Sequence, residues 1–278
     1  MKLQNSCYFC IKFAQAAPSA PFGEPLPVHF NVMRVTALQR DIVWASPQLN
    51  LQRAEAVLAH LPATDLIVLP EMFATGFGAA PEEVAMDADG GMVLQWMRRM
   101  ARQYDCAVAG SVAVERRNRF YFVMPDGTER HYDKHHLFFY GGERSFEAGQ
   151  ERVVVEWRGV RFLLMVCYDL RFPLWNRCFE DYDVALYVAS WPTARITQWA
   201  TLLRARAIEN QCYVVGVNRV GTDPVCDYPG QSAIIHPFGH DIVACPTADE
   251  DVITADLDME ALRHFRDRFP VLRERDMK

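Results

Sequence analysis

The chain is predicted to form an α/β fold in which two packed β-sheets are covered by helices. Strand-like and helix-like segments alternate from Met33 onward, several neighbouring strands are joined by short turns, and no Gly/Ser-rich linker divides the 278 residues. Crossover helices alone would indicate one doubly wound sheet, whereas hairpins mixed with such helices favour two sheets packed face to face. Half of the residues are hydrophobic, which is enough for the core of one large domain.

The first half of the chain supplies strands that alternate with two helices. Strands are expected at 34–39, 65–70, 107–115, 119–124 and 128–132, and helices at 46–60 and 91–104. Ser46-Pro47 is an N-cap residue followed by proline in the first helical turn. The strand at 65–70 is apolar on both faces and is therefore expected in the middle of a sheet. Pro125-Asp126-Gly127 is a turn signal that joins two strands as a hairpin.

The second half repeats this organisation. Strands are expected at 152–157, 160–166, 184–188, 212–218, 231–236 and 241–245, and helices at 195–210 and 258–265. Arg158-Gly159 joins the first two strands as a hairpin, and Pro237 to His240 form the turn of a later pair. Residues 33–278 are thus predicted to be a single domain.

Residues 1–32 differ from the rest and are expected to be a flexible N-terminal extension or the product of an upstream start. They contain Ala- and Pro-rich sequence and make a poor signal-peptide core. Cys7 and Cys10 form a C-x-x-C pair, but without a second pair or a following helix pattern a metal or redox role is disfavoured.

Charge and composition narrow the class of function. The formal net charge of −6 and the pI near 5.8 argue against broad nucleic-acid binding, for which a basic face is expected. No apolar run is long enough to cross a bilayer. Eight scattered cysteines do not resemble a small disulfide framework, so a reducing, cytoplasmic location is expected. His131, His135 and His136 lack further ligands at zinc spacing, so no metal site is expected. No cofactor is expected either.

Three residues whose side chains could take part in catalysis each follow a strand-like run: Glu71, Lys134 and Cys167. Taken singly they are unremarkable as a surface carboxylate, a solvated ammonium and a buried structural thiol. Together they suit acyl transfer, because the thiol attacks a carbonyl carbon, the carboxylate takes its proton, and the cation stabilises the oxyanion. Glu143 is a candidate second carboxylate that positions substrate or water, or else an ordinary loop residue.

The segments around these residues resemble the three catalytic signatures of the nitrilase (carbon–nitrogen hydrolase) superfamily, in the same order. The signatures are Leu69-Pro70-Glu71-Met72-Phe73, Tyr132-Asp133-Lys134-His135-His136-Leu137-Phe138 and Val166-Cys167-Tyr168-Asp169-Leu170-Arg171-Phe172-Pro173. The similarity extends to 204–211 and covers roughly 33–269. It implies a four-layer α-β-β-α sandwich that usually forms a homodimer or a higher homo-oligomer.

The resemblance also implies roles for individual residues. Glu71 would be the general base, Lys134 the cation that stabilises the oxyanion, and Cys167 the nucleophile. Glu143 matches the family's second glutamate, and the backbone N–H of Tyr168 would be the second donor to the oxyanion.

Within the superfamily the chain looks most like the omega-amidases. Tyr168-Asp169 replaces the Trp that follows the nucleophile of true nitrilases, and Ser190-Trp191-Pro192 fits the omega-amidase branch. The resemblance implies hydrolysis of the terminal amide of 2-oxoglutaramate or 2-oxosuccinamate. Arg171 either binds the carboxylate of such a substrate or pairs with Asp169 or Asp181.

Three aromatic residues, Phe138, Tyr168 and Trp191, would wall a small pocket or serve as ordinary core or interface aromatics.

Two alternatives to an omega-amidase remain open. One is a hydrolase of another small aliphatic amide or N-carbamoyl compound. The other is a catalytically inactive binding protein on the same fold, against which the intact Glu71, Lys134 and Cys167 argue.

Overall fold

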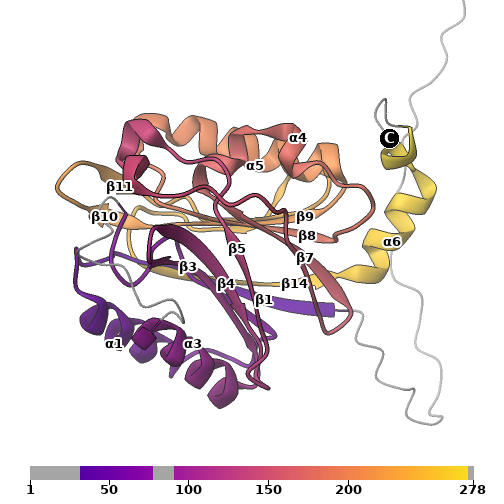
Figure 1. Ribbon diagram of the computed structural model, residues 1–278. Helices are drawn as coiled ribbons and strands as arrows, with labels where there is room; N and C mark the ends of the chain where they lie inside the picture. The colour runs from indigo at the N-terminus through magenta and orange to yellow at the C-terminus, as the bar shows by residue number, and fades with distance from the viewer. Residues whose placement is uncertain (1–31, 78–90, 275–278) are drawn as a thin grey trace, which may run out of the picture.

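Two six-stranded β-sheets lie face to face in the centre of the molecule and form its two inner layers (Figure 1). The computed structural model describes residues 32–77 and 91–274. Helices α1 and α3 cover the outer face of one sheet, and α4 and α5 cover the outer face of the other (Figure 1). The predicted α-β-β-α arrangement is therefore confirmed. The expectations for Cys7 and Cys10 fall outside the described residues.

The first sheet has the strand order β14-β1-β2-β3-β4-β5. Its strands are β1 (Val32–Gln39), β2 (Leu66–Val68), β3 (Ala107–Val114), β4 (Arg117–Val123), β5 (Glu129–Asp133) and β14 (Asp251–Asp258). The pairs β1–β2 and β2–β3 are parallel, and the remaining pairs are antiparallel. The central strand β2 is buried along its length, as its apolar sequence predicts.

The second sheet has the order β13-β12-β9-β8-β7-β6. Its strands are β6 (Val154–Trp157), β7 (Val160–Val166), β8 (Val184–Ala189), β9 (Tyr213–Asn218), β12 (Ala233–Ile235) and β13 (Asp241–Ala244). The parallel strands β7, β8 and β9 form its centre, with an antiparallel strand or hairpin on either side. A separate two-stranded ribbon consists of β10 (Val220–Thr222) and β11 (Asp227–Pro229).

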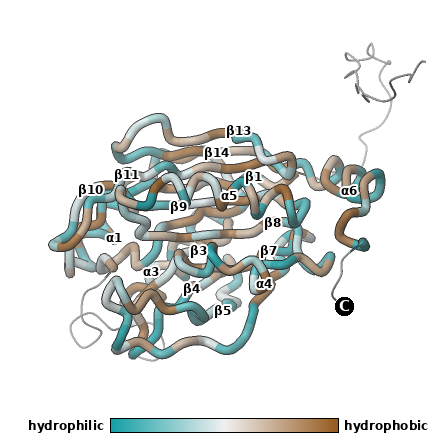
Figure 2. The backbone as a smooth tube through the Cα atoms, turned by 90° about the horizontal axis from the view of Figure 1, so that it is seen from above, coloured by the Kyte–Doolittle hydropathy of each residue, from teal (hydrophilic) through white to brown (hydrophobic). Residues whose placement is uncertain are grey.

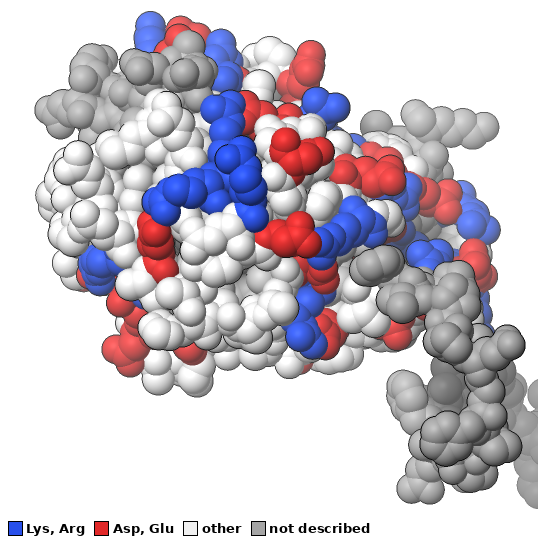
Figure 3. Space-filling model, turned by 90° about the horizontal axis from the view of Figure 1, so that it is seen from below, with Lys and Arg blue, Asp and Glu red and all other residues white. Residues whose placement is uncertain are grey.

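The helices are α1 (Pro47–Leu58), α3 (Gly91–Tyr104), α4 (Pro173–Asn176), α5 (Ile196–Asn210) and α6 (Met259–Arg268). Hydrophobic residues gather on the strands between the helical layers, as the hydropathy colouring shows (Figure 2). On the face formed by α1 and α3, basic and acidic side chains alternate without a broad field of one sign (Figure 3). Ion pairs such as Arg99–Glu55, at 2.7 Å, account for part of this mixing. No helix of the described segments is long and apolar enough to cross a membrane.

Strand β14 is absent from the sequence prediction, which placed only a helix near Asp258. Ile253, Ala255 and Leu257 alternate along β14 and are buried against the core, but Asp251, Asp256 and Asp258 in the same segment obscure the pattern. The helix begins one residue later than predicted, because the Asp258 carboxylate caps it by accepting a hydrogen bond from the Ala261 N–H at 2.8 Å. The short strands β10 and β11 were not predicted either.

Candidate active site

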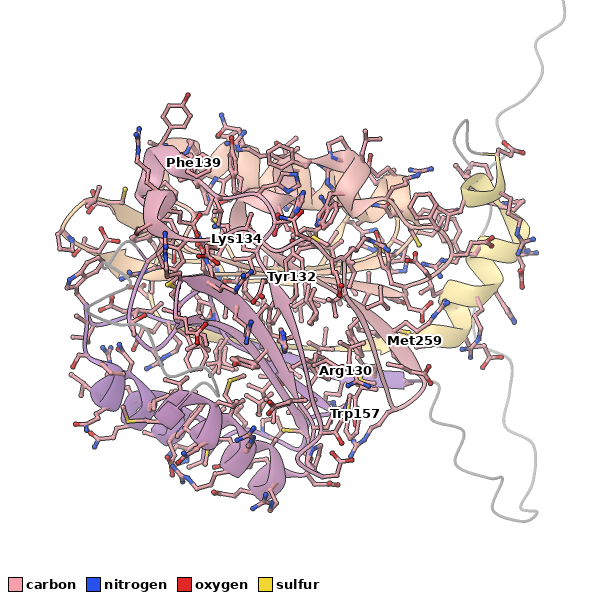
Figure 4. All side chains as sticks on the ribbon, in the orientation of Figure 1. Arg130, Tyr132, Lys134, Phe139, Trp157 and Met259 are labelled. Atoms are coloured by element: carbon pink, nitrogen blue, oxygen red, sulfur yellow. The ribbon has the colours of Figure 1, made fainter. Side chains whose placement is uncertain are left out.

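The ends of three strands bring Glu71, Lys134 and Cys167 together between the two sheets. Lys134 directly follows β5 and Cys167 directly follows β7, whereas Glu71 lies three positions beyond β2. Figure 4 shows Lys134 and Tyr132 at the level between the sheets, with Phe139 further out. The first sheet therefore supplies the carboxylate and the ammonium, and the second supplies the thiol.

Lys134 bridges two buried carboxylates. Its Nζ atom lies 2.9 Å from Glu71 Oε1 and 2.8 Å from Glu143 Oε2. All three side chains are buried. The amide nitrogen of Asn118, on β4, donates to both carboxylates, at 2.8 Å to Glu71 Oε1 and 3.0 Å to Glu143 Oε1. A buried charge is tolerated when it is paired and hydrogen-bonded, and this cluster meets that condition.

Backbone N–H groups complete the shell of each carboxylate. Ser190 N, just beyond β8, donates to Glu71 Oε2 at 2.8 Å, so the second sheet also holds the glutamate of the first. Phe138 N donates to Glu143 Oε2 at 2.7 Å. Gly142, with φ of 108°, joins two short 3₁₀ turns and reverses the chain so that Glu143 turns inward.

The shared environment shifts the pKa values of the cluster. Burial alone would lower the pKa of Lys134, but the charges of Glu143 and Glu71 outweigh burial and hold it above its ordinary value of 10.5. Lys134 is therefore a permanent cation. Burial, together with the nearby charge of Glu143, raises the pKa of Glu71 above 4.5 although Lys134 opposes the shift. A carboxyl with a raised pKa is suited to exchange protons near neutral pH.

Cys167 sits in a strained turn at the end of β7. Its φ angle is 45°, in the left-handed region that few non-glycine residues adopt, and it begins the 3₁₀ turn Cys167–Arg171. Burial and the adjacent Glu71 carboxylate raise the pKa of the thiol well above 9.0, while Lys134 opposes that shift. The resting thiol is therefore neutral and requires a base before it can act as a nucleophile.

Asp169 fixes this turn to the loop of Lys134. Its Oδ1 atom accepts hydrogen bonds from both the N–H and Nδ1 of His136, at 3.0 and 2.8 Å. Its Oδ2 atom accepts from the Tyr132 hydroxyl at 2.8 Å and from Val166 N at 3.1 Å. Asp169 is thus occupied by four donors from both sides of the site, which couples the position of the nucleophile to that of the cation.

A pocket of about 620 Å³ opens onto Cys167. The predicted wall residues Phe138, Tyr168 and Trp191 all line it, and the ring centres of Phe138 and Tyr168 lie 5.0 Å apart. Other lining residues are Phe77, Tyr140, Gly141, Gly142, Arg171, Ser190, Pro192, Arg195, Asp223, Val225, Cys226 and Tyr228.

Arg171 faces this pocket and not a structural carboxylate. Its guanidinium carbon lies 4.9 Å from the centre of the Trp191 ring. Asp169 is bound by Tyr132 and His136, and Asp181 pairs with Arg152. Of the two alternatives for Arg171, pairing with Asp169 or Asp181 is therefore wrong.

The histidines near Lys134 take part in ring stacking. His135 stacks on Trp175 with ring centres 3.9 Å apart, and His136 stacks on Phe172 at 3.5 Å. Within the described ranges, no three His, Cys, Asp or Glu side chains come together in a way that could hold a metal ion.

Asn118 and Arg195 belong to the site but were missed by sequence reasoning. The predicted strand began at Arg119, whereas β4 begins at Arg117 and turns Asn118 toward the core. An uncharged amide at the start of a strand carries no sequence signal of its own. Arg195, just before α5, was predicted only to be the first residue of a helix.

Comparisons with known proteins agree with this geometry. The carbon–nitrogen hydrolase family model matches residues 34–267. Omega-amidase YafV of Escherichia coli strain K12 is 46% identical over 252 residues, covering 88% of this chain and 97% of that protein. The 2-oxoglutaramate amidase of Bacillus subtilis is 34% identical over 247 residues, covering 85% and 95% of the two chains.

Solved structures of similar proteins also belong to this family or share its fold. XC1258 from Xanthomonas campestris, a CN-hydrolase superfamily protein with an arsenic adduct in the active site, is 40% identical with a TM-score of 0.84. The match covers 89% of this chain and 98% of XC1258. Nit3 of Saccharomyces cerevisiae, at 22% identity and a TM-score of 0.79, shares the fold. With a family model that spans most of the domain and relatives matched over nearly their whole length, the chain belongs to the carbon–nitrogen hydrolase family.

Proposed function

We propose that this protein is an omega-amidase that hydrolyses the terminal amide of a small 2-oxo dicarboxylic acid monoamide, releasing ammonia. The observation that carries the proposal is the buried cluster in which Lys134 lies 2.9 Å from Glu71 and 2.8 Å from Glu143. The cluster lies beside Cys167, which lines a pocket. The relatives named as omega-amidase and 2-oxoglutaramate amidase support the choice of substrate.

The first half of the reaction forms a thioester. Glu71 accepts the proton of the Cys167 thiol as sulfur attacks the amide carbon. The negative charge that develops on the amide oxygen is stabilised by the Lys134 ammonium and the backbone N–H of Tyr168. Protonated Glu71 then returns the proton to the amide nitrogen, the C–N bond breaks, and ammonia leaves.

The second half hydrolyses the thioester. Glu71, again a carboxylate, removes a proton from a water that attacks the thioester carbon. The C–S bond breaks, the sulfur regains a proton from Glu71, and the acid product leaves. Glu143 holds Lys134 in place by accepting its hydrogen bond, and Asn118 holds Glu71 by donating to its carboxylate and to that of Glu143.

The test is ammonia release from a panel of amides, with 2-oxoglutaramate and 2-oxosuccinamate first and simple aliphatic amides and N-carbamoyl compounds after them. We expect the 2-oxo acid amides to have the highest kcat/KM. The Cys167→Ala variant should lose turnover by at least about 10³-fold while keeping its fold. Preference for an N-carbamoyl compound or a neutral amide would instead favour the alternative hydrolase, and turnover by Cys167→Ala would refute the mechanism.

Intact-mass detection of an acyl adduct distinguishes the enzyme from an inactive binding protein. Because Cys226 also lines the pocket, the modified peptide must be identified and Cys226→Ser serves as the control. An adduct that persists in Cys226→Ser and is lost in Cys167→Ala is expected. An adduct only on Cys226 would contradict the proposed nucleophile.

Homodimer formation, a cytoplasmic location and a single domain over 33–278 belong to the same proposal. Large exposed hydrophobic side chains on the α4 and α5 face, such as Leu174 and Ile208, support self-association. Light scattering on the full chain, and on a version lacking residues 1–32, measures the oligomeric state and shows whether the extension contributes to it.

A further inference from the structure

A second guanidinium group, that of Arg195, lines the pocket together with Arg171. Arg171 ends the 3₁₀ turn that begins at Cys167, and Arg195 ends the turn before α5, so they reach the pocket from different elements. The Arg195 guanidinium carbon lies 5.1 Å from the centre of the Phe138 ring, just as Arg171 lies 4.9 Å from Trp191. Aromatic faces hold such planar groups in place without neutralising them.

Trp191 connects the two arginines. Its ring lies beneath the Arg171 guanidinium, and its Nε1 donates to the Arg195 backbone oxygen at 2.6 Å. Trp191 is itself buried, and its backbone N–H donates to Asn218 Oδ1 at 2.7 Å. Both cations are therefore positioned by one rigid residue that also lines the pocket.

Neither guanidinium has a charged partner in the described part of the chain. No carboxylate of 32–77 or 91–274 lies within 4.0 Å of Arg171 or Arg195, and neither side chain donates a hydrogen bond to those residues. Both are half-buried, which makes an uncompensated charge more costly than on an open surface.

The carboxylate that shares this pocket, Asp223, is already satisfied by its own loop. Its Oδ1 accepts from Val225 N and Cys226 N, both at 2.8 Å, and its Oδ2 accepts from the Tyr228 hydroxyl at 2.5 Å. The buried Arg219 lies 3.8 Å from it. Asp223 therefore leaves the positive charge on the pocket wall uncancelled.

We propose that Arg195 is a specificity-determining residue that binds, together with Arg171, the acid end of the amide substrate. One guanidinium pairs with a carboxylate through two parallel hydrogen bonds. A second guanidinium suits a substrate whose acid end carries a further hydrogen-bond acceptor beside the carboxylate, such as a 2-oxo oxygen. The ligand class is a short linear monoamide with a carboxylate at the far end. The inference rests on the proposed amidase activity but not on which acidic amide is the natural substrate.

The experiment compares three amides of equal chain length: 2-oxoglutaramate, glutaramate, which lacks the 2-oxo group, and pentanamide, which lacks both acid-end groups. The variants are Arg195→Met, which removes the charge, and Arg195→Lys, which keeps it without the fork. Arg204→Met is the matched control on α5, because Arg204 pairs with Asp241 on the surface at 2.6 Å.

We expect Arg195→Met to lower kcat/KM for 2-oxoglutaramate by about 10- to 100-fold, the range for a hydrogen bond to a charged group. The loss for glutaramate should be smaller, and pentanamide should change by less than about threefold. Arg195→Lys should recover part of the loss, and Arg204→Met should match the wild type. Binding of 2-oxoglutarate to Cys167→Ala protein, measured by calorimetry, should weaken in the same ratio when Arg195→Met is added.

The outcomes separate this inference from the proposed function. Equal losses on all three amides, or unchanged 2-oxoglutarate binding, would show that Arg195 acts only through packing and would overturn the inference. A wild type with no preference for an acid end would overturn it as well, even for a true amidase. If glutaramate is preferred over both others and Arg195→Met erases that preference, the inference holds and the 2-oxo substrate is wrong.

Discussion

The buried cluster around Lys134 and the arginine-bearing wall of the pocket differ in how their charges are paired. Around Lys134 every charged group has a partner, since the ammonium lies within 2.9 Å of two carboxylates and Asn118 donates to both. On the pocket wall, Arg171 and Arg195 rest on aromatic rings, and no carboxylate of the described residues lies within 4.0 Å of either. The Lys134 cluster is complete without a substrate, whereas on our proposal the two arginines gain their carboxylate partner from the substrate.

This contrast predicts that charge removal is destabilising only in the Lys134 cluster. Lys134→Met leaves two carboxylates buried beside each other, so the free energy of unfolding should fall by about 3–5 kcal/mol and activity should be lost. Urea denaturation measures the loss. The control is Arg99→Met, which removes an exposed partner of Glu55 and should cost less than about 1 kcal/mol. Equal losses in the free energy of unfolding for the two variants would mean that the burial of the Lys134 cluster does not make its ion pairs more important for stability.

Asn118→Asp adds a third carboxylate to the Lys134 cluster without changing the size of the side chain. Its negative charge should raise the pKa of Glu71 further, because like charges oppose ionisation. The acid limb of the pH profile of kcat/KM should therefore move to higher pH, and activity at neutral pH should fall by about 10- to 100-fold. An unshifted limb would show that Asn118 does not act on Glu71.

Glu143→Gln should move the same limb in the opposite direction. Glu143 raises the pKa of Glu71 by its charge, and it also shares the Lys134 ammonium. Its removal eliminates the repulsion and leaves Lys134 to Glu71 alone, so both changes lower the pKa of Glu71. Activity should then persist to lower pH than in the wild type, although its maximum is reduced. A shift to higher pH would contradict the sharing of Lys134.

The smallest effect is expected for the stability of Arg171→Met. Only a contact with the Trp191 ring is lost, so the free energy of unfolding should change by less than about 1 kcal/mol while kcat/KM for an acidic amide falls. Thermal or urea unfolding and ammonia release are measured on the same preparation. A stability loss as large as that of Lys134→Met would mean that Arg171 has a structural partner.

Some residues of the site could be predicted from the sequence and others could not. Glu71, Lys134 and Cys167 were identified because each follows a strand-like run, and the ends of these strands, from two sheets, meet at this site. Their roles remain predictions until the variants are measured. Asn118 and Arg195 could not be found this way, since one is a neutral amide at a strand start and the other a cation before a helix. Their importance depends on which rings and carboxylates lie opposite, and only the packed sheets determine that.

Strand β14 is an element of the fold that local sequence patterns could not predict. Its acidic residues hide the alternation of Ile253, Ala255 and Leu257, and its partner β1 lies at the other end of the described chain. A pairing partner so distant in sequence gives no local signal, whereas hairpins such as β6–β7 are visible in the turn residues between them.

The position of β14 also has a consequence for how the protein is made. Residues 251–258 pair with 32–39 along the full length of both strands. During synthesis β1 emerges well before β14, so the edge of β1 that pairs with β14 stays uncovered until residues 251–258 have been made. An open edge strand invites pairing with another chain, so the growing polypeptide is most exposed to aggregation during this interval.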